Sequence, residues 1–378
     1  MNRSIHIITI LGIPVEINYS WFIIFFLVTW TLAATVFPNS HDMQGLPTII
    51  YWLAAIVASL FFFSSLLLHE LSHSYVAIKN DLPIKGITLF VFGGVAHISK
   101  EPQTPGTEFK MAIAGPLCSL SLSFIFSVLA RLFHNIGLPA VITVITQYLS
   151  EINLMVCVFN LLPGFPLDGG RILRSALWSI TNDLKRATLI ATSLGKLFAY
   201  LLMGFGIVLF FSNVDFISGI WLILIGFFLQ EAASASYQQV AFNKYLAGVK
   251  VRDIMTKNVV TVSDNLTILS LVDGYFFKYR FTSIPVVTDD GDVKGIVTIH
   301  SVKDVPRDRW ADTNVPEAMI PIRSNLVVAP NADILEALAQ MAGNGVGRLL
   351  VTQGGKLVGI ISQRDVIRLF EVREDLGG

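Results

Sequence analysis

The sequence predicts a polytopic α-helical membrane domain of about six transmembrane helices with a small membrane-associated β element, followed by a soluble α/β domain. The chain has 378 residues, of which 53% are hydrophobic and 14% charged, whereas a soluble chain has about 25% charged residues. The charge is also uneven. Residues 1–240 hold 11 of the 27 basic and 11 of the 27 acidic residues, so about 9% of this part is charged, against about 23% of residues 241–378. The membrane-crossing runs all lie in the first part.

Composition excludes several classes of protein. The chain is too apolar to be disordered or collagen-like, and its net charge of zero predicts no nucleic-acid partner. The two cysteines, Cys118 and Cys157, lie inside apolar runs and form no Cys-x-x-Cys motif, so we interpret them as packing residues. The N-terminus lacks a compact apolar core with a cleavage site, so the first long apolar run is expected to remain as a membrane span.

A helix crosses the hydrocarbon core of a bilayer in about 20 residues. Five runs clearly meet this length, and a sixth, the fourth along the chain, contains several polar residues and is expected to be irregular. The spans expected are Tyr19–Phe37, Ile49–Ile78, Met111–Phe133, Val141–Leu162, Ala187–Phe211 and Phe216–Ala233.

Loop charges predict the orientation of these spans. The first and fifth loops contain no Lys or Arg, whereas the second and fourth are basic. By the positive-inside rule, both termini, the even-numbered loops and the soluble domain are expected to be cytoplasmic in a multi-pass protein of the cell (plasma or inner) membrane. The basic residues are Arg3, Lys79, Lys85, Lys100, Lys110, Arg171, Arg174, Lys185, Arg186, Lys244 and Lys250.

Between the second and third spans lies a strand-like segment, Ile84–Ser99, that is too short to cross the membrane. Non-helical backbone at membrane depth is tolerated only where it is buried in protein or lines a wet cavity. We therefore expect a hairpin or re-entrant element beside a functional site.

The second span ends with a His-Glu-x-x-His motif that begins at His69 and ends at His73. The i, i+4 spacing places both imidazoles on one helical face, where they can bind one Zn²⁺, and Glu70 can reach a metal-bound water as general base. His69 precedes Lys79, the expected cytoplasmic end, by about ten residues, which corresponds to roughly 15 Å of depth. The alternative is a hydrogen-bonded polar cluster in a helical bundle. The depth indicates hydrolysis within the bilayer.

A catalytic zinc needs a third protein ligand, and Asp168 is the best candidate. Pro163 and Pro166 are expected to end the fourth span, after which glycines allow a tight turn, so Asp168 is predicted on an unwound segment facing a polar cavity. A helix-capping Asp in a cytoplasmic loop is the structural alternative.

These motifs resemble the site-2 protease family, the intramembrane zinc metalloproteases of peptidase family M50. The family pairs His-Glu-x-x-His with Asn-x-x-Pro-x-x-x-x-Asp-Gly in a later span, and the segment from Asn160 to Gly169 fits the second pattern. The strand element with Gly93-Gly94 and the Ala114-Gly115-Pro116 sequence also resemble the family.

The resemblance implies one zinc per subunit, held by His69, His73 and Asp168, with Glu70 activating the zinc-bound water and Asn160 stabilising the oxyanion. It implies a metalloendopeptidase that cleaves transmembrane segments of membrane proteins, in regulated intramembrane proteolysis. Because a substrate helix has its carbonyls in hydrogen bonds, it must unwind or add as a strand, and the segment Gly86–Gly94 could supply an edge for that pairing.

From Lys250 onward a repeat appears. Val251–Met255 matches Val315–Met319, and Gly295–Thr298 matches Gly359–Ser362, both at an offset of 64 residues. Each copy has a helix-like stretch, then two short apolar strands joined by a turn, then a helix start. Two such copies imply a paired domain.

This part resembles a tandem pair of CBS domains, which implies a regulatory adenine nucleotide (ATP, ADP or AMP) and a possible homodimer. The nucleotide-binding pattern Gly-h-h-Ser/Thr-x-x-Asp, with h apolar, is met by Ser362 and Asp365 in the second copy. In the first copy Thr298 fits, but Ser301 occupies the Asp position. A dimerisation module without a ligand is the alternative.

The expected organisation is a protease domain over residues 1–240, a linker over 241–250, CBS domains over 251–371 (251–308 and 315–371) and a tail over 372–378. The competing function is a CBS-gated membrane transporter or channel. The set of three ligands beside a general base favours the protease, because a conduction path needs no such base.

Overall fold

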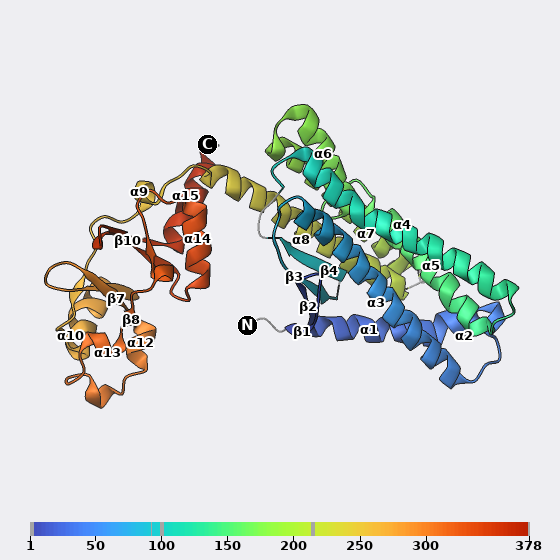
Figure 1. The fold of residues 1–378 in the computed structure, drawn as a ribbon, viewed down its shortest axis with the longest axis horizontal. Helices are drawn as coiled ribbons and strands as arrows, with labels where there is room; N and C mark the ends of the chain where they lie inside the picture. The colour runs from blue at the N-terminus through green and yellow to red at the C-terminus, as the bar shows by residue number, and fades with distance from the viewer. Residues whose placement is uncertain (1–3, 92, 99–101, 213–215, 377–378) are drawn as a thin grey trace. The chain divides into compact units, whose positions relative to one another are not determined.

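The computed structural model describes residues 4–91, 93–98, 102–212 and 216–376, so Arg3 and Lys100 of the loop-charge argument lie outside the described residues. The chain forms two compact units, Met1–Gln238 and Gln239–Gly378, shown in Figure 1. Each unit is built around its own buried residues.

Six helices in the described residues are long and apolar enough to cross a membrane, which confirms the predicted membrane domain. The fourth is a continuous helix, so the expected irregularity was wrong. The proline at position 163 lies beyond its end, and its polar side chains do not interrupt the backbone. The helices are α1 (Tyr19–Thr31, continued by a π-helical turn at Leu32–Val36 and by α2, Phe37–Asn39), α3 (Thr48–Lys79), α4 (Pro105–Asn135), α5 (Ala140–Asn160), α7 (Leu184–Phe211) and α8 (Phe216–Leu246).

The first unit places small residues between its helices and large apolar residues outside. On α7 the buried positions include Ala187, Ala191, Gly195 and Ala199, whereas Phe205 is exposed. This is the packing of helices in lipid, where small residues let backbones approach and the outer surface meets acyl chains.

A four-stranded sheet lies beside these helices, with the strand order β1-β2-β3-β4. β3 (Ile84–Phe90) and β4 (Gly93–Ile98) form the expected hairpin. The sequence reasoning did not predict β1 (Ser4–Ile10) or β2 (Ile13–Asn18), and β2 pairs in parallel with β3. In this ordering β4 is an edge strand.

A further helix, α6 (Asp168–Thr181), follows α5 and begins at Asp168. The prediction that Asp168 lies on an unwound segment was therefore wrong. The unwound part ends at Leu167, and the two glycines after Asp168 are helical, because their lack of a Cβ lets this turn lie against the backbone of the preceding loop. Arg174, counted above as a loop charge, is buried in α6.

The second unit begins within the last turns of α8. Leu246 is fully buried in one core with Val251, Ile334 and Ile361, so part of the segment 241–250 belongs to this unit. The helices of the unit are α9 (Val251–Ile254), α10 (Ile268–Leu271, continued by a π-helical turn at Val272–Phe276 and by α11, Phe277–Tyr279), α12 (Ile299–Lys303), α13 (Val315–Ala318), α14 (Ile334–Gly343) and α15 (Gln363–Asp375).

Each copy of the repeat forms most of one sheet, and residues at the start of each copy pair with a strand of the other. β8 is the first strand of the second copy but pairs with β7 of the first, and Thr256 near the start of the first copy bridges to Ile360 of the second. The paired α/β domain is therefore confirmed as one folding unit. The sheets are β5-β6-β7-β8 (Val262–Ser263, Ser283–Val287, Val293–Thr298, Ile320–Pro321) and β9-β10-β11 (Val327–Val328, Arg348–Gln353, Lys356–Ser362).

Candidate metal centre

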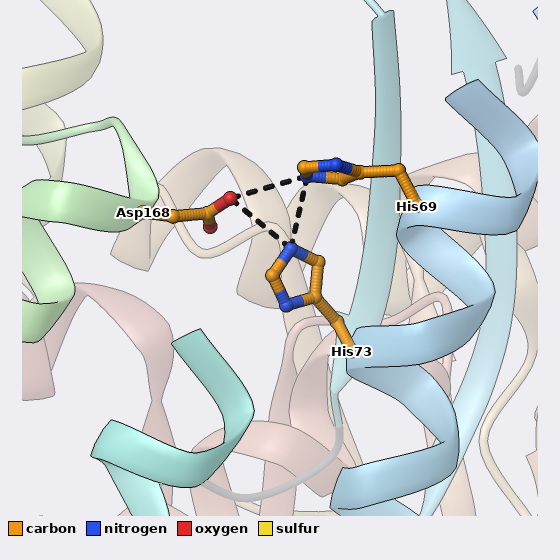
Figure 2. A group of neighbouring side chains, drawn as sticks. All are labelled: His69, His73 and Asp168. Atoms are coloured by element: carbon orange, nitrogen blue, oxygen red, sulfur yellow. Dashed lines mark hydrogen bonds and ion pairs between the residues drawn. The ribbon is translucent and has the colours of Figure 1, made fainter. Parts of the chain in front are cut away.

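Two histidines of α3 and the first residue of α6 converge on one point (Figure 2). The Oδ2 atom of Asp168 lies 3.1 Å from Nε2 of His69 and 3.2 Å from Nε2 of His73, and the two Nε2 atoms are 3.2 Å apart. Both histidines are buried, and the Asp168 side chain is 13% exposed. The structure thus brings together three residues from segments about 100 positions apart in sequence.

The other ring nitrogen of each histidine faces α4. Nδ1 of His73 lies 2.6 Å from the carbonyl oxygen of Met111, and Nδ1 of His69 lies 2.9 Å from Oγ of Ser119. A carbonyl only accepts, so Nδ1 of His73 carries the proton and Nε2 of the neutral ring keeps its lone pair. Such partners on the far nitrogen are typical of metal-ligating histidines. The sequence reasoning missed Met111 and Ser119, which no motif spacing marks.

The geometry fits a tetrahedral zinc ion. Ligand atoms about 2.0–2.1 Å from a tetrahedral zinc lie roughly 3.3 Å from one another. The three atoms of the cluster form a triangle with edges of 3.1, 3.2 and 3.2 Å. Two nitrogens and one carboxylate oxygen are also a donor set that catalytic zinc uses, with the fourth position left for water.

Gly115 of α4 leaves the space that the two imidazoles occupy. A Cβ at this position would overlap Nε2 of both His69 and His73. Only glycine lets α4 pass this close to the cluster. The sequence Ala114-Gly115-Pro116, noted above as a family resemblance, thus has a steric role at the metal centre.

The loop that leads into Asp168 is held by α7. The backbone N–H of Phe165 donates to the carbonyl of Ala191, at 3.2 Å. A Cβ at Gly195 would overlap the carbonyl oxygen of Phe165, and one at Gly164 would meet the backbone of Gly195. These close approaches fix the loop, and with it the start of α6, against a membrane helix.

Glu70, the predicted base, follows His69 on α3, is half-buried and lies against β4. A Cβ at Gly94 of β4 would overlap the Cγ atom of Glu70, so the edge strand passes directly beside this side chain. The hairpin predicted between the second and third spans therefore lies beside the candidate site.

Asn160, the predicted oxyanion donor, is the last residue of α5 and is partly buried. Its side chain forms no hydrogen bond within the part of the chain that the structure describes. Its amide is therefore available to a substrate, and its role stays a prediction.

The helices that follow the last strand of each copy begin at the nucleotide pattern. Ser362 and Asp365 begin α15, and Thr298 with the non-matching Ser301 begins α12. Ser362 donates to Oδ2 of Asp365 through its hydroxyl at 2.6 Å and its backbone N–H at 2.8 Å, forming a capping box on α15. Thr298 and Ser301 form the matching box on α12. The Asp365 carboxylate and the hydroxyls of these residues therefore form the capping hydrogen bonds of the two helices.

Arg348 lies opposite Ser362 in the β10–β11 register and was not predicted. Its guanidinium donates to Oγ1 of Thr282 at 2.8 Å and to the backbone and side chain of Ser283, which joins the two copies. Partial burial lowers the pKa of Arg348, while the nearby Asp365 carboxylate acts in the opposite direction.

Comparisons with known proteins cover both units. The family description Peptidase family M50 matches residues 57–144 and 138–203, and the CBS domain description matches residues 251–308 and 317–372.

Relatives resemble the chain over its full length. The protein Rip3 of Mycobacterium tuberculosis is 34% identical over 373 residues, covering 98% of this chain and 94% of its own length. Zinc metalloprotease MJ0392 of Methanocaldococcus jannaschii is 34% identical over 384 residues, covering 100% and 99%. Among solved structures, a site-2 protease from Methanocaldococcus jannaschii is 34% identical, covers 61% of this chain and 94% of that chain, and has a TM-score of 0.43.

Proposed function

The chain belongs to peptidase family M50, as a multi-pass membrane metalloprotease with a C-terminal pair of CBS domains, and we propose that it is a zinc-dependent intramembrane endopeptidase that cleaves transmembrane segments of membrane proteins. The observation that carries the proposal is the convergence of Asp168 on His69 and His73. The two histidines and Glu70 lie in a helix that is apolar enough to span a membrane. Ionisable residues at that depth are costly unless they function.

Zinc, when bound, supplies a Lewis acid that acidifies a water molecule and polarises the scissile carbonyl. The chain supplies the remaining parts. His69 and His73, held through their Nδ1 atoms by α4, present Nε2, and Asp168 presents one carboxylate oxygen. Glu70 accepts the proton of the attacking water and returns it to the leaving amine. The side-chain amide N–H of Asn160 donates a hydrogen bond to the oxyanion.

The edge strand β4 offers a place for the substrate backbone. It pairs with β3 on one side, and Gly94 lies against Glu70, so a strand added to the free edge would run past the catalytic carboxylate. Replacing glycines of the segment 86–94 with bulky residues is expected to lower cleavage while zinc remains bound. Unchanged cleavage would remove this role from the sheet.

The proposed orientation places both termini and the CBS pair in the cytoplasm. It is supported by the basic residues of the second and fourth loops, among them Lys79, Lys85, Lys185 and Arg186. Labelling of single cysteines in the soluble unit of intact cells tests it, and labelling by an impermeant reagent from outside would contradict it.

The CBS pair is proposed to bind an adenine nucleotide and thereby regulate the protease, and to form a homodimer. Support comes from the ordered carboxylate of Asp365 and hydroxyl of Ser362, with Arg348 nearby to supply positive charge for a phosphate. Calorimetry of the full chain with ATP, ADP and AMP tests binding. The absence of heat with all three would favour a module without a nucleotide.

The experiment that tests the zinc site is metal analysis of the purified full chain, combined with cleavage of a single-span substrate before and after treatment with a chelator. The expected result is one zinc per chain, cleavage that stops on chelation, and recovery when Zn²⁺ is added back. Full cleavage by a metal-free chain would overturn the proposal.

A further inference from the structure

A buried ion pair joins α4 to α6 below the metal cluster. Glu108 of α4 is fully buried, and its Oε1 atom accepts hydrogen bonds from Nε of Arg174 at 2.6 Å and from Nη2 of the same residue. Arg174 is 6% exposed. Arg171 approaches the same oxygen, at 3.9 Å. Neither Glu108 nor the two arginines has a part in the chemistry described above.

Stability alone is a weak explanation for this pair. Removing two charges from water costs several kcal/mol per ion, and well-packed apolar residues are often as stabilising as a buried ion pair. Glu108 is also incompletely satisfied, since its Oε2 atom has no hydrogen-bond partner among the described residues. A group that is costly to bury is better explained by the geometry that it imposes.

The position of Glu108 on α4 indicates what that geometry is. Glu108, Met111, Gly115 and Ser119 are spaced three, four and four residues apart, so they form one stripe along the helix. Met111 holds one histidine, Ser119 holds the other, and Gly115 gives both rings their space. All members of the stripe except Glu108 therefore contact the histidines of the metal centre or leave space for them.

The partners of Glu108 lie on the helix that carries the third ligand. Asp168, Arg171 and Arg174 follow one another at intervals of three residues, so each is a neighbour of the next along about 9 Å of α6. Arg174 also lies over the ring of Phe165, 4.8 Å from its centre, in the loop that α7 holds. The ion pair therefore fixes both the rotation of α6 and its distance from α4.

We propose that Glu108 is the positioning residue for the third zinc ligand: by holding Arg174 and Arg171, it sets the place of Asp168 opposite the two histidines. One face of α4 then positions all three ligands, two directly and one through α6. This inference rests on the proposed zinc site and adds a residue to it that makes no contact with metal or substrate.

The test compares the full chain with its Glu108→Gln variant. Zinc affinity is measured by competition with a chelator, and the coordination geometry by the visible spectrum of the Co²⁺-substituted protein. Residues that orient metal ligands typically change metal affinity 10–100-fold when replaced, so we expect a loss in that range together with an altered cobalt spectrum. Ser59→Ala is the matched control, because it removes a buried inter-helix hydrogen bond to Thr29 that does not involve the cluster. The zinc affinity and the cobalt spectrum of Ser59→Ala are expected to be those of the wild type.

Further variants keep the inference testable if Glu108→Gln does not fold. Arg174→Lys keeps the charge but loses the two-point contact, and is expected to weaken zinc binding less than Arg174→Gln. The exchange Glu108→Arg with Arg174→Glu is expected to recover part of the affinity lost in either single variant. Wild-type zinc affinity and an unchanged cobalt spectrum in Glu108→Gln would overturn the inference. A wild-type chain that binds no zinc would instead overturn the proposed function.

Discussion

Nδ1 of His73 donates a hydrogen bond to the carbonyl oxygen of Met111, at 2.6 Å. The acceptor is a backbone atom, so no substitution of Met111 removes it. It fixes the ring orientation and the tautomer in which Nε2 faces Asp168 and His69. The His73 ring therefore presents an unprotonated Nε2 toward the other two ligand atoms, as a metal ligand requires.

Ser119→Ala removes the corresponding partner of His69. Its hydroxyl is 2.9 Å from Nδ1 and both side chains are buried, so the ring nitrogen would lose its only described partner on that side. We expect zinc affinity to fall about 10–100-fold, while Ser119→Thr keeps part of it. Chelator competition measures both. Equal zinc affinities of Ser119→Ala and wild type would show that the Met111 carbonyl and the packing of α4 are enough to orient the histidines.

Gly115→Ala should damage the centre by steric overlap. The added Cβ would occupy the place of the two Nε2 atoms, so the rings or α4 must move. Gly106→Ala is the control on the same helix, since a Cβ there meets no atom within 4 Å. We expect Gly115→Ala to lose zinc and cleavage and Gly106→Ala to keep both, measured by metal content and substrate turnover. Loss in both variants would point to a general effect on α4.

Asp365→Asn tests the nucleotide site of the second CBS copy. Losing a charged acceptor for the ribose hydroxyls is expected to weaken nucleotide binding by about 1.5–3 kcal/mol, or roughly 10–100-fold. The variant also weakens the cap of α15, worth about 1 kcal/mol. Ser301→Ala weakens the equivalent cap in the first copy, where the carboxylate is missing. Calorimetry should therefore show a large loss for Asp365→Asn and little for Ser301→Ala. Similar losses of nucleotide affinity in the two variants would indicate that the nucleotide does not bind at Asp365.

Local sequence signals predicted the six spans, the β3–β4 hairpin and the repeat, because each follows from hydropathy or spacing within a short window. The convergence of His69, His73 and Asp168 was predictable for a different reason. Zinc chemistry demands three ligands, and few polar residues in so apolar a chain can supply them.

The remaining features depend on contacts between distant segments. β2 pairs with β3, which lies about 70 residues away in sequence. The sequence of β2 alone contains no pattern that predicts this partner. The start of α6 was missed because Gly169 and Gly170 suggest a turn, whereas their lack of a Cβ allows the helix to lie against the backbone of the preceding loop. The pairing of Glu108 with Arg174 likewise joins two helices, which is why the sequence analysis counted that arginine as a charge of the fourth loop.

Glu70→Gln offers the most direct test of the central claim, that this chain hydrolyses peptide bonds within the membrane. The change keeps the size of the side chain but removes the base, while both histidines and Asp168 are untouched. The full chain and the variant would be reconstituted in liposomes with a single-span substrate, and the product ends mapped by mass spectrometry. We predict that the wild type cuts inside the hydrophobic segment, and that Glu70→Gln retains zinc but cleaves about 10²–10⁴-fold more slowly. Equal cleavage by both proteins, or product ends that lie only outside the hydrophobic segment, would contradict the claim.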